Sequence, residues 1–196
     1  MEELLSKLFE ECRSILNRFS AESKGVIVNI AKEISYTFLR GGKVYVMGNG
    51  GSAADAQHIA AEFVNRFKIE RPPLPVIAIT TDSSILTSIS NDFSFDDVFL
   101  KQIMAFANPN DIVWAISTSG NASNILKTLR YCSKNNIKTI GFTGANGGKM
   151  SGMCDIVLKA PSKDTPRIQE IHILTAHFIC ELVDEILFGK FAQVDE

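Results

Sequence analysis

The stretch Val44-Tyr45-Val46-Met47 followed by Gly48-Asn49-Gly50-Gly51-Ser52 decides the fold of this chain. The apolar run predicts a buried strand, and the glycine-rich turn opens into a predicted helix over residues 53–67. Because the first turn of a helix has unpaired N–H groups and the positive end of the helix dipole, this junction is a candidate anion site. It lacks the third glycine of a dinucleotide fingerprint and the Gly-Lys-Ser/Thr of a Walker A loop. The alternatives are a phosphate site and a plain tight connection.

A second turn of the same design follows the predicted strand 112–116. It reads Ser117-Thr118-Ser119-Gly120-Asn121 and leads into a predicted helix that begins near Ser123. In a parallel α/β sheet, ligands bind at the carboxyl ends of the strands, where both turns lie. The simpler alternative is that the serines only cap a helix. Two matched turns favour a sugar phosphate over a dinucleotide.

Composition excludes several classes of protein. With 196 residues, 45% of them hydrophobic, the chain is expected to form one globular domain with an ample core. A net charge of −2 and the absence of any basic run argue against a nucleic-acid partner. The apolar stretches are shorter than the roughly 20 residues of a membrane span, and the acidic, amphipathic N-terminus is unlike a signal peptide. The four scattered cysteines predict free core thiols in a reducing cytoplasm: Cys12, Cys132, Cys154 and Cys180.

Strands and helices are expected to alternate after two initial helices, 2–19 and 25–39, the second ended by Gly41-Gly42. The fold class is therefore α/β, with a parallel five-stranded sheet flanked by helices, an N-terminal helical pair (1–40) and a core over 43–190 within a single domain, 1–196. Residues 71–75, rich in proline, form an extended linker. The strand predictions are 44–47, 76–80, 112–116, 139–143 and 156–158.

The first and last predicted helices have more apolar surface than one domain can bury. The helix 2–19 lies outside the alternating unit, and the long helix 167–188 is apolar on most of its circumference. A helix that is apolar all round is usually buried all round. We expect a subunit interface to supply that burial.

Polar residues on two predicted helices form a second candidate site. His58 and Glu62 are four residues apart and share one helix face. Gln169 and His177 are eight apart on the last helix, within about 80° of each other around its axis. Such groups can bind a divalent metal such as zinc or act as an acid/base pair. The alternative is a surface i,i+4 pair and a buried structural histidine.

The sequence around these residues resembles the sugar isomerase (SIS) family and, within it, the phosphoheptose isomerases. The resemblance covers nearly the whole chain. It rests on residues 48–67, Thr80-Thr81-Asp82-Ser83-Ser84, Ser90-Asn91-Asp92-Phe93, Ser117-Thr118-Ser119-Gly120-Asn121, Gly147-Gly148-Lys149-Met150 and Thr165-Pro166-Arg167-Ile168-Gln169-Glu170-Ile171-His172.

The resemblance implies a homotetramer with active sites between subunits, which converts D-sedoheptulose 7-phosphate to D-glycero-D-manno-heptose 7-phosphate. It implies Glu62 as the base and His177 as its acid/base partner. Ser52, Ser117, Thr118 and Ser119 would hold the phosphate, and Asn49, Arg66, Asp92 and Gln169 would line the sugar. Gly50, Gly51, Glu62, Asn91 and Ser123 complete the predicted substrate site. Some members of the family bind zinc, and the matching ligands are His58, Glu62, Gln169 and His177.

One departure and two rival functions remain. Ala122 stands where the family usually has a serine or threonine that donates to the phosphate, and Ser123 is the neighbouring substitute. The main rival is a non-catalytic SIS scaffold like the protein that binds the replication initiator DnaA. That protein lacks the glutamate and histidine that match Glu62 and His177, so their presence favours the enzyme. The second rival is an isomerase for a related sugar phosphate.

Overall fold

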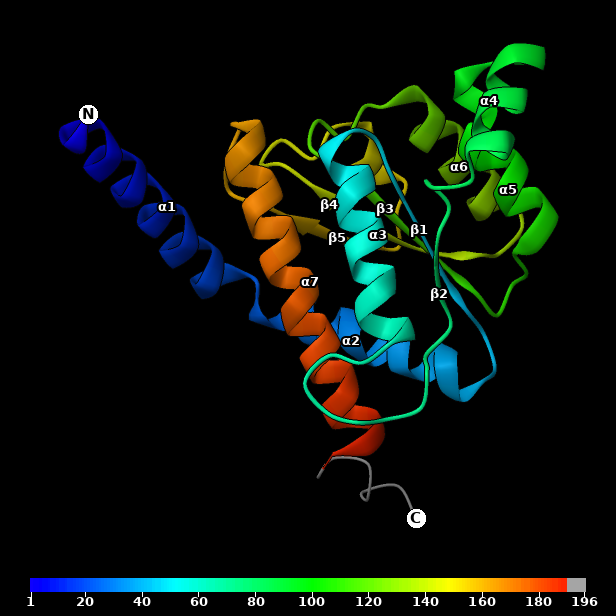
Figure 1. The fold of residues 1–196 in the computed structure, drawn as a ribbon, viewed down its shortest axis with the longest axis horizontal. Coiled ribbons are helices and arrows are strands. Elements are labelled where there is room, and N and C mark those ends of the chain that lie inside the picture. The colour runs from blue at the N-terminus through cyan, green and yellow to red at the C-terminus, as the bar shows by residue number, and fades with distance from the viewer. Residues whose placement is uncertain (190–196) are drawn as a thin grey trace.

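A parallel sheet of five strands is the centre of the computed structural model, which describes residues 1–189 (Figure 1). The strand order is β2-β1-β3-β4-β5, and every neighbouring pair is parallel. The sheet predicted from the sequence is therefore confirmed, although β2 ends two residues early. The predicted core limit at 190 and the chain end at 196 lie outside the described residues. The strand bounds are Val44–Gly48 (β1), Val76–Ala78 (β2), Ile112–Ser117 (β3), Lys138–Thr143 (β4) and Ile156–Lys159 (β5).

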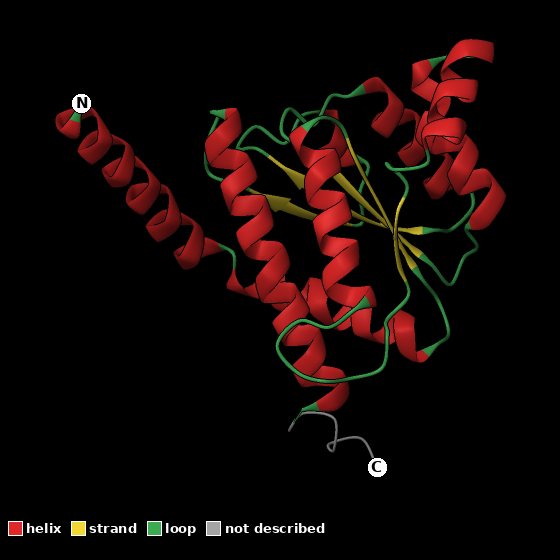
Figure 2. Cartoon of the chain, viewed as in Figure 1, coloured by secondary structure: helices red, strands yellow, loops and turns green. Residues whose placement is uncertain are grey.

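Helices precede the sheet and connect its strands (Figure 2). The helix after β1 begins at Gly51 and ends at Val64, so it is shifted toward the N-terminus from the predicted range 53–67. The α-helices are Glu2–Glu22 (α1), Lys24–Leu39 (α2), Gly51–Val64 (α3), Ser83–Asp92 (α4), Val98–Phe106 (α5), Ser123–Lys134 (α6) and Thr165–Phe188 (α7), and the 3-10 turns are Phe95–Asp97 (η1) and Lys149–Gly152 (η2).

The central strands β1 and β3 are buried along their whole length, which explains why they are almost entirely apolar. Along β3, Ile112, Trp114 and Ile116 point into one core, while Val113 and Ala115 point into the other. This alternation follows from the two-residue period of a strand. The first core also takes side chains of α2, α3 and α7, and the second takes those of α5 and α6. The helices that carry His58, Glu62 and His177 therefore cover the same face.

Helix α1 extends away from the body of the domain (Figure 1). Its only buried side chains are Ile15 and Phe19, whereas Leu5 is 52% and Phe9 is 61% exposed. The prediction that this helix has little to pack against within one chain is confirmed. The apolar face of α1 is available for contact with another surface.

The last helix is less buried than its composition suggested. Ile171, Ile179 and Val183 lie in the core, but Phe178 is 42% exposed in the single chain. Neither α7 nor any other described helix is long and apolar enough to cross a lipid bilayer. The apolar circumference of α7 is therefore only partly covered within one chain.

All four cysteines are free, as predicted, but they are not all in the core. Cys132 and Cys180 are buried, and Cys154 is half-buried. Burial raises the pKa of Cys132 and of Cys154 to about 12, so both thiols are protonated at neutral pH. The assignment of Cys12 to the core was wrong, because this residue lies on the protruding helix α1.

His172 is the buried histidine of α7. Its side chain is 1% exposed, and its Nε2 lies 3.2 Å from the carbonyl oxygen of Thr143 at the end of β4. Nδ1 has no hydrogen-bond partner among the described residues. Burial lowers the pKa of His172 to about 4, with the Thr143 carbonyl opposing the shift. The imidazole is therefore neutral in the folded protein.

His172 should make the stability of the protein pH-dependent. Because the pKa is near 6.5 when unfolded and about 4 when folded, the unfolded chain takes up a proton first as the pH falls. Between pH 7 and pH 5 the wild type should lose about 2 kcal/mol more unfolding free energy than His172→Gln. Urea unfolding of both proteins at one protein concentration measures this. Parallel pH profiles would contradict the assignment.

Candidate functional site

Three of the predicted metal-binding and catalytic side chains meet between α3 and α7. On α3, Nε2 of His58 lies 3.0 Å from Oε1 of Glu62. From α7, His177 places its Nε2 3.4 Å from Nε2 of His58. The ligating atoms of all three residues lie within 4.8 Å of one another. We call this group the His-Glu-His cluster.

The His-Glu-His cluster lies at the rim of the helix pair and remains open to solvent. The side chain of His58 is 47% exposed and that of Glu62 is 25% exposed. Phe67, in the loop that follows α3, stacks on the ring of His177 with 5.5 Å between ring centroids. The sequence had predicted Phe67 as part of the helix, and its role as an aromatic wall was missed. The cluster is accessible to a small polar ligand from one side.

The His-Glu-His cluster fits a zinc ion. Two imidazole nitrogens and one carboxylate oxygen are a common ligand set for catalytic zinc. Two nitrogens, each about 2.0–2.1 Å from a tetrahedral zinc, lie about 3.4 Å apart. The two Nε2 atoms of His58 and His177 have this separation, 3.4 Å.

Asp55 is a further acidic group on the same face of α3. It lies one turn before His58, and its Oδ2 has no hydrogen-bond partner among the described residues. Burial raises the pKa of Asp55, and the nearby His58 partly offsets the shift. The sequence analysis missed this residue. The spacing of positions 55, 58 and 62 could have found it, because all three fall on one helical face.

The stretch 48–52, which we call the first phosphate turn because the sequence predicts an anion there, leads into α3. Gly50 is the N-cap, with a φ of 55° that favours glycine. A Cβ on Gly51 would overlap the side-chain amide of Gln169 on α7. Ser52 is buried in the first helical turn, where the helix dipole favours an anion. The turn therefore brings the start of α3 into direct contact with the start of α7.

The second phosphate turn, residues 117–121 and named on the same ground, is joined to Gly148 and to the start of η2. The side chain of Asn121 donates to the Ser119 carbonyl at 3.0 Å and accepts from the Lys149 amide at 3.1 Å. Gly148 has a φ of 55°, and a Cβ there would overlap the Ser119 carbonyl. Within the turn Ser117 is buried, and Thr118 is half-buried. The hydroxyl of Ser119 is exposed at a fixed position.

A pair of asparagines joins the two phosphate turns. Asn49 donates to Asn124 Oδ1 at 3.0 Å, and Asn124 donates back to Asn49 Oδ1 at 2.9 Å. Asn124, in the first turn of α6, is only 2% exposed. The sequence analysis missed this residue because nothing in its local pattern indicates the contact. The next residue toward the N-terminus, Ser123, donates its hydroxyl hydrogen to Asp96.

The other predicted site residues lie apart from the His-Glu-His cluster. Gln169 contacts Gly51, two turns of α7 before His177. Arg66 lies beyond the end of α3, with Nη1 3.6 Å from Oε2 of Glu70. At the end of α4, Asn91 donates to the Asp92 carboxylate at 2.9 Å. Within residues 1–189, none of these side chains hydrogen-bonds to the cluster.

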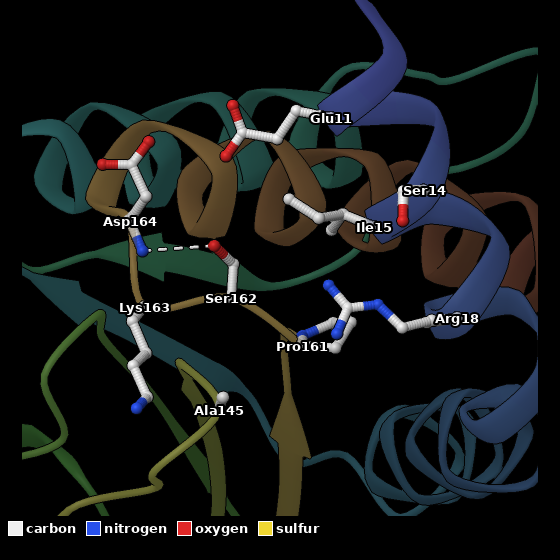
Figure 3. A pocket seen from close by; sticks show the side chains of 9 residues that line it. All are labelled: Glu11, Ser14, Ile15, Arg18, Ala145, Pro161, Ser162, Lys163 and Asp164. Atoms are coloured by element: carbon white, nitrogen blue, oxygen red, sulfur yellow. Dashed lines mark hydrogen bonds between the residues drawn. The ribbon is translucent and has the colours of Figure 1, made fainter. Parts of the chain in front are cut away.

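Two cavities, of about 500 and 680 Å³, are lined by no residue of the phosphate turns or of the cluster. One, of about 500 Å³, lies between α1 and the loops that follow β4 and β5 (Figure 3). It is lined by charges of both signs, among them Arg18, Lys163 and Asp164. A small cavity of about 120 Å³ borders Asn49 and Gly50. Neither of the two larger cavities therefore encloses the predicted site.

Comparison with known proteins assigns the chain to a family. The sequence model of the SIS domain family matches residues 7–144. The phosphoheptose isomerase of Trichlorobacter lovleyi is 45% identical over 192 residues, 98% of this chain and 98% of the relative. The chain belongs to the SIS domain family. Within that family it is similar to the phosphoheptose isomerase of Nitratidesulfovibrio vulgaris, with 47% identity over 91% of this chain and 86% of the relative.

Solved structures agree with this assignment to the SIS domain family. The structure of the phosphoheptose isomerase of Neisseria gonorrhoeae has a TM-score of 0.89 and 36% identity, over 94% of this chain and 98% of that one. The single SIS domain predicted from the sequence is confirmed. With relatives of this identity over nearly its whole length, the chain is an enzyme, a sugar-phosphate isomerase.

Ala122 offers a test of the second phosphate turn. It is the N-cap of α6 and provides no side-chain hydrogen bond. In Ala122→Ser, the hydroxyl oxygen can cap the helix, worth about 1 kcal/mol, while its hydrogen donates to an anion. Phosphate binding should tighten by roughly 1–3 kcal/mol. Calorimetric titration with inorganic phosphate measures this, with Ala145→Ser as the control. Unchanged or weaker binding would contradict an anion site at this turn.

Proposed function

We propose that the chain is a cytoplasmic aldose–ketose isomerase that converts D-sedoheptulose 7-phosphate to D-glycero-D-manno-heptose 7-phosphate through an enediol. This reaction is the first step toward nucleotide-activated heptose for bacterial surface glycans. The observation that carries the proposal is the His-Glu-His cluster, which combines a carboxylate with imidazoles. The printed names of the relatives support the substrate, and four cysteines without disulfides support the compartment.

Glu62 and His177 provide the proton transfers of this reaction. Isomerisation needs a base that removes the proton from the carbon next to the carbonyl and returns it to the neighbouring carbon. Glu62 has that role, and His177 moves the proton between the two oxygens of the enediol. Phe67 stacks on His177 and limits the rotation of its ring. The reaction consumes no other reactant, so no redox cofactor is required.

The two phosphate turns bind the part of the substrate that does not react. The N-terminal end of α3 and the hydroxyls of Ser52, Ser117, Thr118 and Ser119 hold the phosphate. Because phosphate and reacting carbons are at opposite ends of the sugar, binding energy from one end orients the other. The asparagine pair keeps the turns at a fixed separation. The turns therefore act as an anchor for the substrate.

We propose zinc as the cofactor, with one ion per subunit held by His58, Glu62, Gln169 and His177. The first, second and fourth of these residues lie together in the chain. Bound zinc would polarise the substrate carbonyl. A residue that binds the ion cannot be a free base at the same moment, so either the coordination would be labile or the ion would mainly polarise the carbonyl.

We propose that the active enzyme is a homotetramer with sites between subunits. The predicted substrate residues extend from the first turn of α3 to Arg66, about 20 Å away along the helix. An extended seven-carbon sugar phosphate is shorter than this span, which supports a site completed by a second chain. An apolar groove of about 680 Å³ between α1, α2 and α7, lined by Leu16, Ile27 and Phe178 among others, offers the contact surface.

A SIS scaffold that binds DnaA is the weaker alternative. A scaffold has no need of a carboxylate and two imidazoles held within hydrogen-bond distance at a solvent-accessible rim. An isomerase for a related sugar phosphate differs only in the length or stereochemistry of its substrate. Incubation with ketose 7-, 6- and 5-phosphates separates that alternative from the proposal.

Glu62→Gln and His177→Gln test the mechanism. Glu62→Gln keeps the shape of the side chain, and each variant removes a proton-transfer group, so kcat should fall by about 10²–10⁴. The double variant should be little worse than either single variant, because the two residues act as a unit. Deuterium at C1 of the ketose should exchange with solvent in the wild type and in neither variant. Metal analysis, with turnover before and after chelation, tests the zinc ion.

The matched control for the mechanism is Glu185→Gln, which neutralises an exposed glutamate of α7 outside the site. It should retain wild-type turnover. If Glu62→Gln and His177→Gln also retain near-normal turnover, the isomerase mechanism is wrong and the scaffold hypothesis is favoured.

The oligomeric state is tested by light scattering at micromolar concentration. We expect a mass about four times the 21.5 kDa of one chain. Leu16→Glu, in the apolar groove, should lower that mass, because a carboxylate would be buried in an apolar contact. A stable, folded wild-type monomer would contradict the proposed tetramer.

A further inference from the structure

Arg71 places its entire guanidinium group between α3 and α7. Its side chain is only 1% exposed and faces Asp184 of α7, whose side chain is 5% exposed. Nε donates to Asp184 Oδ1 at 2.8 Å. The two other nitrogens donate to backbone carbonyls at the end of α3: Nη1 to Phe63 at 2.6 Å and Nη2 to Glu62 at 2.9 Å. One side chain thus contacts both helices of the His-Glu-His cluster.

On the α3 side, Arg71 forms the C-terminal cap of the helix. The last carbonyl groups of a helix have no partner within it. Two of them in α3, those of Glu62 and Phe63, accept from the planar guanidinium, which fixes their relative directions. The Glu62 that receives this contact is the residue whose side chain belongs to the cluster. Arg71 therefore holds the backbone from which the proposed base projects.

On the α7 side, Arg71 forms a buried ion pair with Asp184. Asp184 lies seven residues after His177, which is about two turns further along nearly the same helix face. Its Oδ2 has no hydrogen-bond partner among residues 1–189. The ion pair with Arg71 is therefore the polar contact that fixes Asp184 against α3.

The loop 65–75 provides a second connection to His177. Besides its contacts with the helices, Arg71 donates to the carbonyl of Pro72 at 3.1 Å within this loop. Phe67, from the same loop, stacks on the His177 ring. The guanidinium therefore holds the loop that forms the aromatic wall of the cluster.

The cluster lies between two fixed points of the helix pair. At the start of α3, Gly51 and Gln169 are in direct contact, and at its end Arg71 joins Glu62 to Asp184. His58, Glu62 and His177 occupy the turns between these contacts. Moving either end changes the separation of the carboxylate and the imidazole.

We propose that Arg71, acting through Asp184, is a positioning residue that sets the distance and orientation between Glu62 and His177. It touches neither substrate nor reacting atoms. Its effect on turnover rests on the proposed isomerase function, whereas its effect on the geometry of the cluster does not. The two effects can therefore be measured separately.

Two variants and one control test the role of Arg71. Arg71→Lys keeps the charge but cannot reach Asp184 and both carbonyls with one ammonium group. Asp184→Asn keeps an acceptor for Nε and removes the charge. The control is Lys68→Gln, which breaks an exposed ion pair between the same loop and α7, where Lys68 Nζ lies 2.7 Å from Glu181 Oε2. Exposed pairs of this kind contribute little.

The first measurement is the nuclear Overhauser effect between the rings of His58 and His177, whose centroids are 5.0 Å apart. The chain has three histidines, so the signals can be assigned, and His172 against Phe142 is an internal reference for the core. In Arg71→Lys the His58–His177 effect should weaken while the reference persists. It should weaken less in Asp184→Asn and remain unchanged in Lys68→Gln. An unchanged effect in a folded Arg71→Lys would overturn the proposal.

The second measurement is turnover. A misplacement of about 1 Å can cost about 10²-fold in rate, so kcat of Arg71→Lys should fall by about 10–100-fold while KM stays near the wild-type value. If kcat falls and KM rises by the same factor, or if both variants are unfolded, Arg71 serves the fold alone. If the wild type turns over no ketose phosphate, the proposed function fails, and the ring contact still decides the role of Arg71.

Discussion

The close packing of α3 on α7 is the constraint on which the rest of the structure depends. The two helices share one core on one face of the sheet. Because Gly51 has no side chain, Gln169 of α7 can lie directly against the start of α3. Because α3 starts at the carboxyl end of β1, its first turn lies at the ligand-binding edge of the sheet. Its later turns carry His58 and Glu62 to the α7 rim. One helix therefore connects the phosphate turn with the His-Glu-His cluster.

The buried polar contacts are better explained by position than by stability. A buried ion pair such as Arg71 with Asp184 loses much of its attraction to desolvation, and an apolar pair is often as stable. The same holds for the asparagine pair Asn49–Asn124, because the hydrogen-bonded amide groups contribute little hydrophobic stabilisation. Both contacts join segments that carry predicted site residues. The chain uses directional hydrogen bonds where the relative placement of two elements matters.

The sequence predicted the sheet well because burial on both faces leaves a strong signal. Each strand is an apolar run, and the predicted starts agree with the structure to within one residue. The predicted end of α3 was wrong because Arg71, eight residues beyond Phe63, caps the helix. No local pattern in the sequence shows that contact. Asn124 was missed for the same reason. Asp55 was available from spacing alone, and Cys12 was misplaced because composition cannot separate a core helix from a protruding one.

The predicted site residues were found by helical spacing, by the two turns and by resemblance, and the single chain brings only part of them together. His58, Glu62 and His177 converge because each lies on the face where α3 meets α7. Gln169, Arg66, Asn91 and Asp92 lie elsewhere in the same chain. Sequence patterns give the chemistry of a residue and its helix face, but not the chain on which its partner lies. The division of these residues between neighbouring subunits is a property of the proposed assembly.

The exposure of the His-Glu-His cluster in one chain gives a chemical reason for the proposed tetramer. An enediol is better protected from side reactions, and charges act more strongly on it, when water is excluded. In one chain His58 remains 47% exposed, and α1 with the adjoining groove leaves apolar surface open. A neighbouring subunit docked on that surface would bury both the apolar face and the rim of α3 and α7. The same contact would then provide the stability of the tetramer and the closed environment for proton transfer.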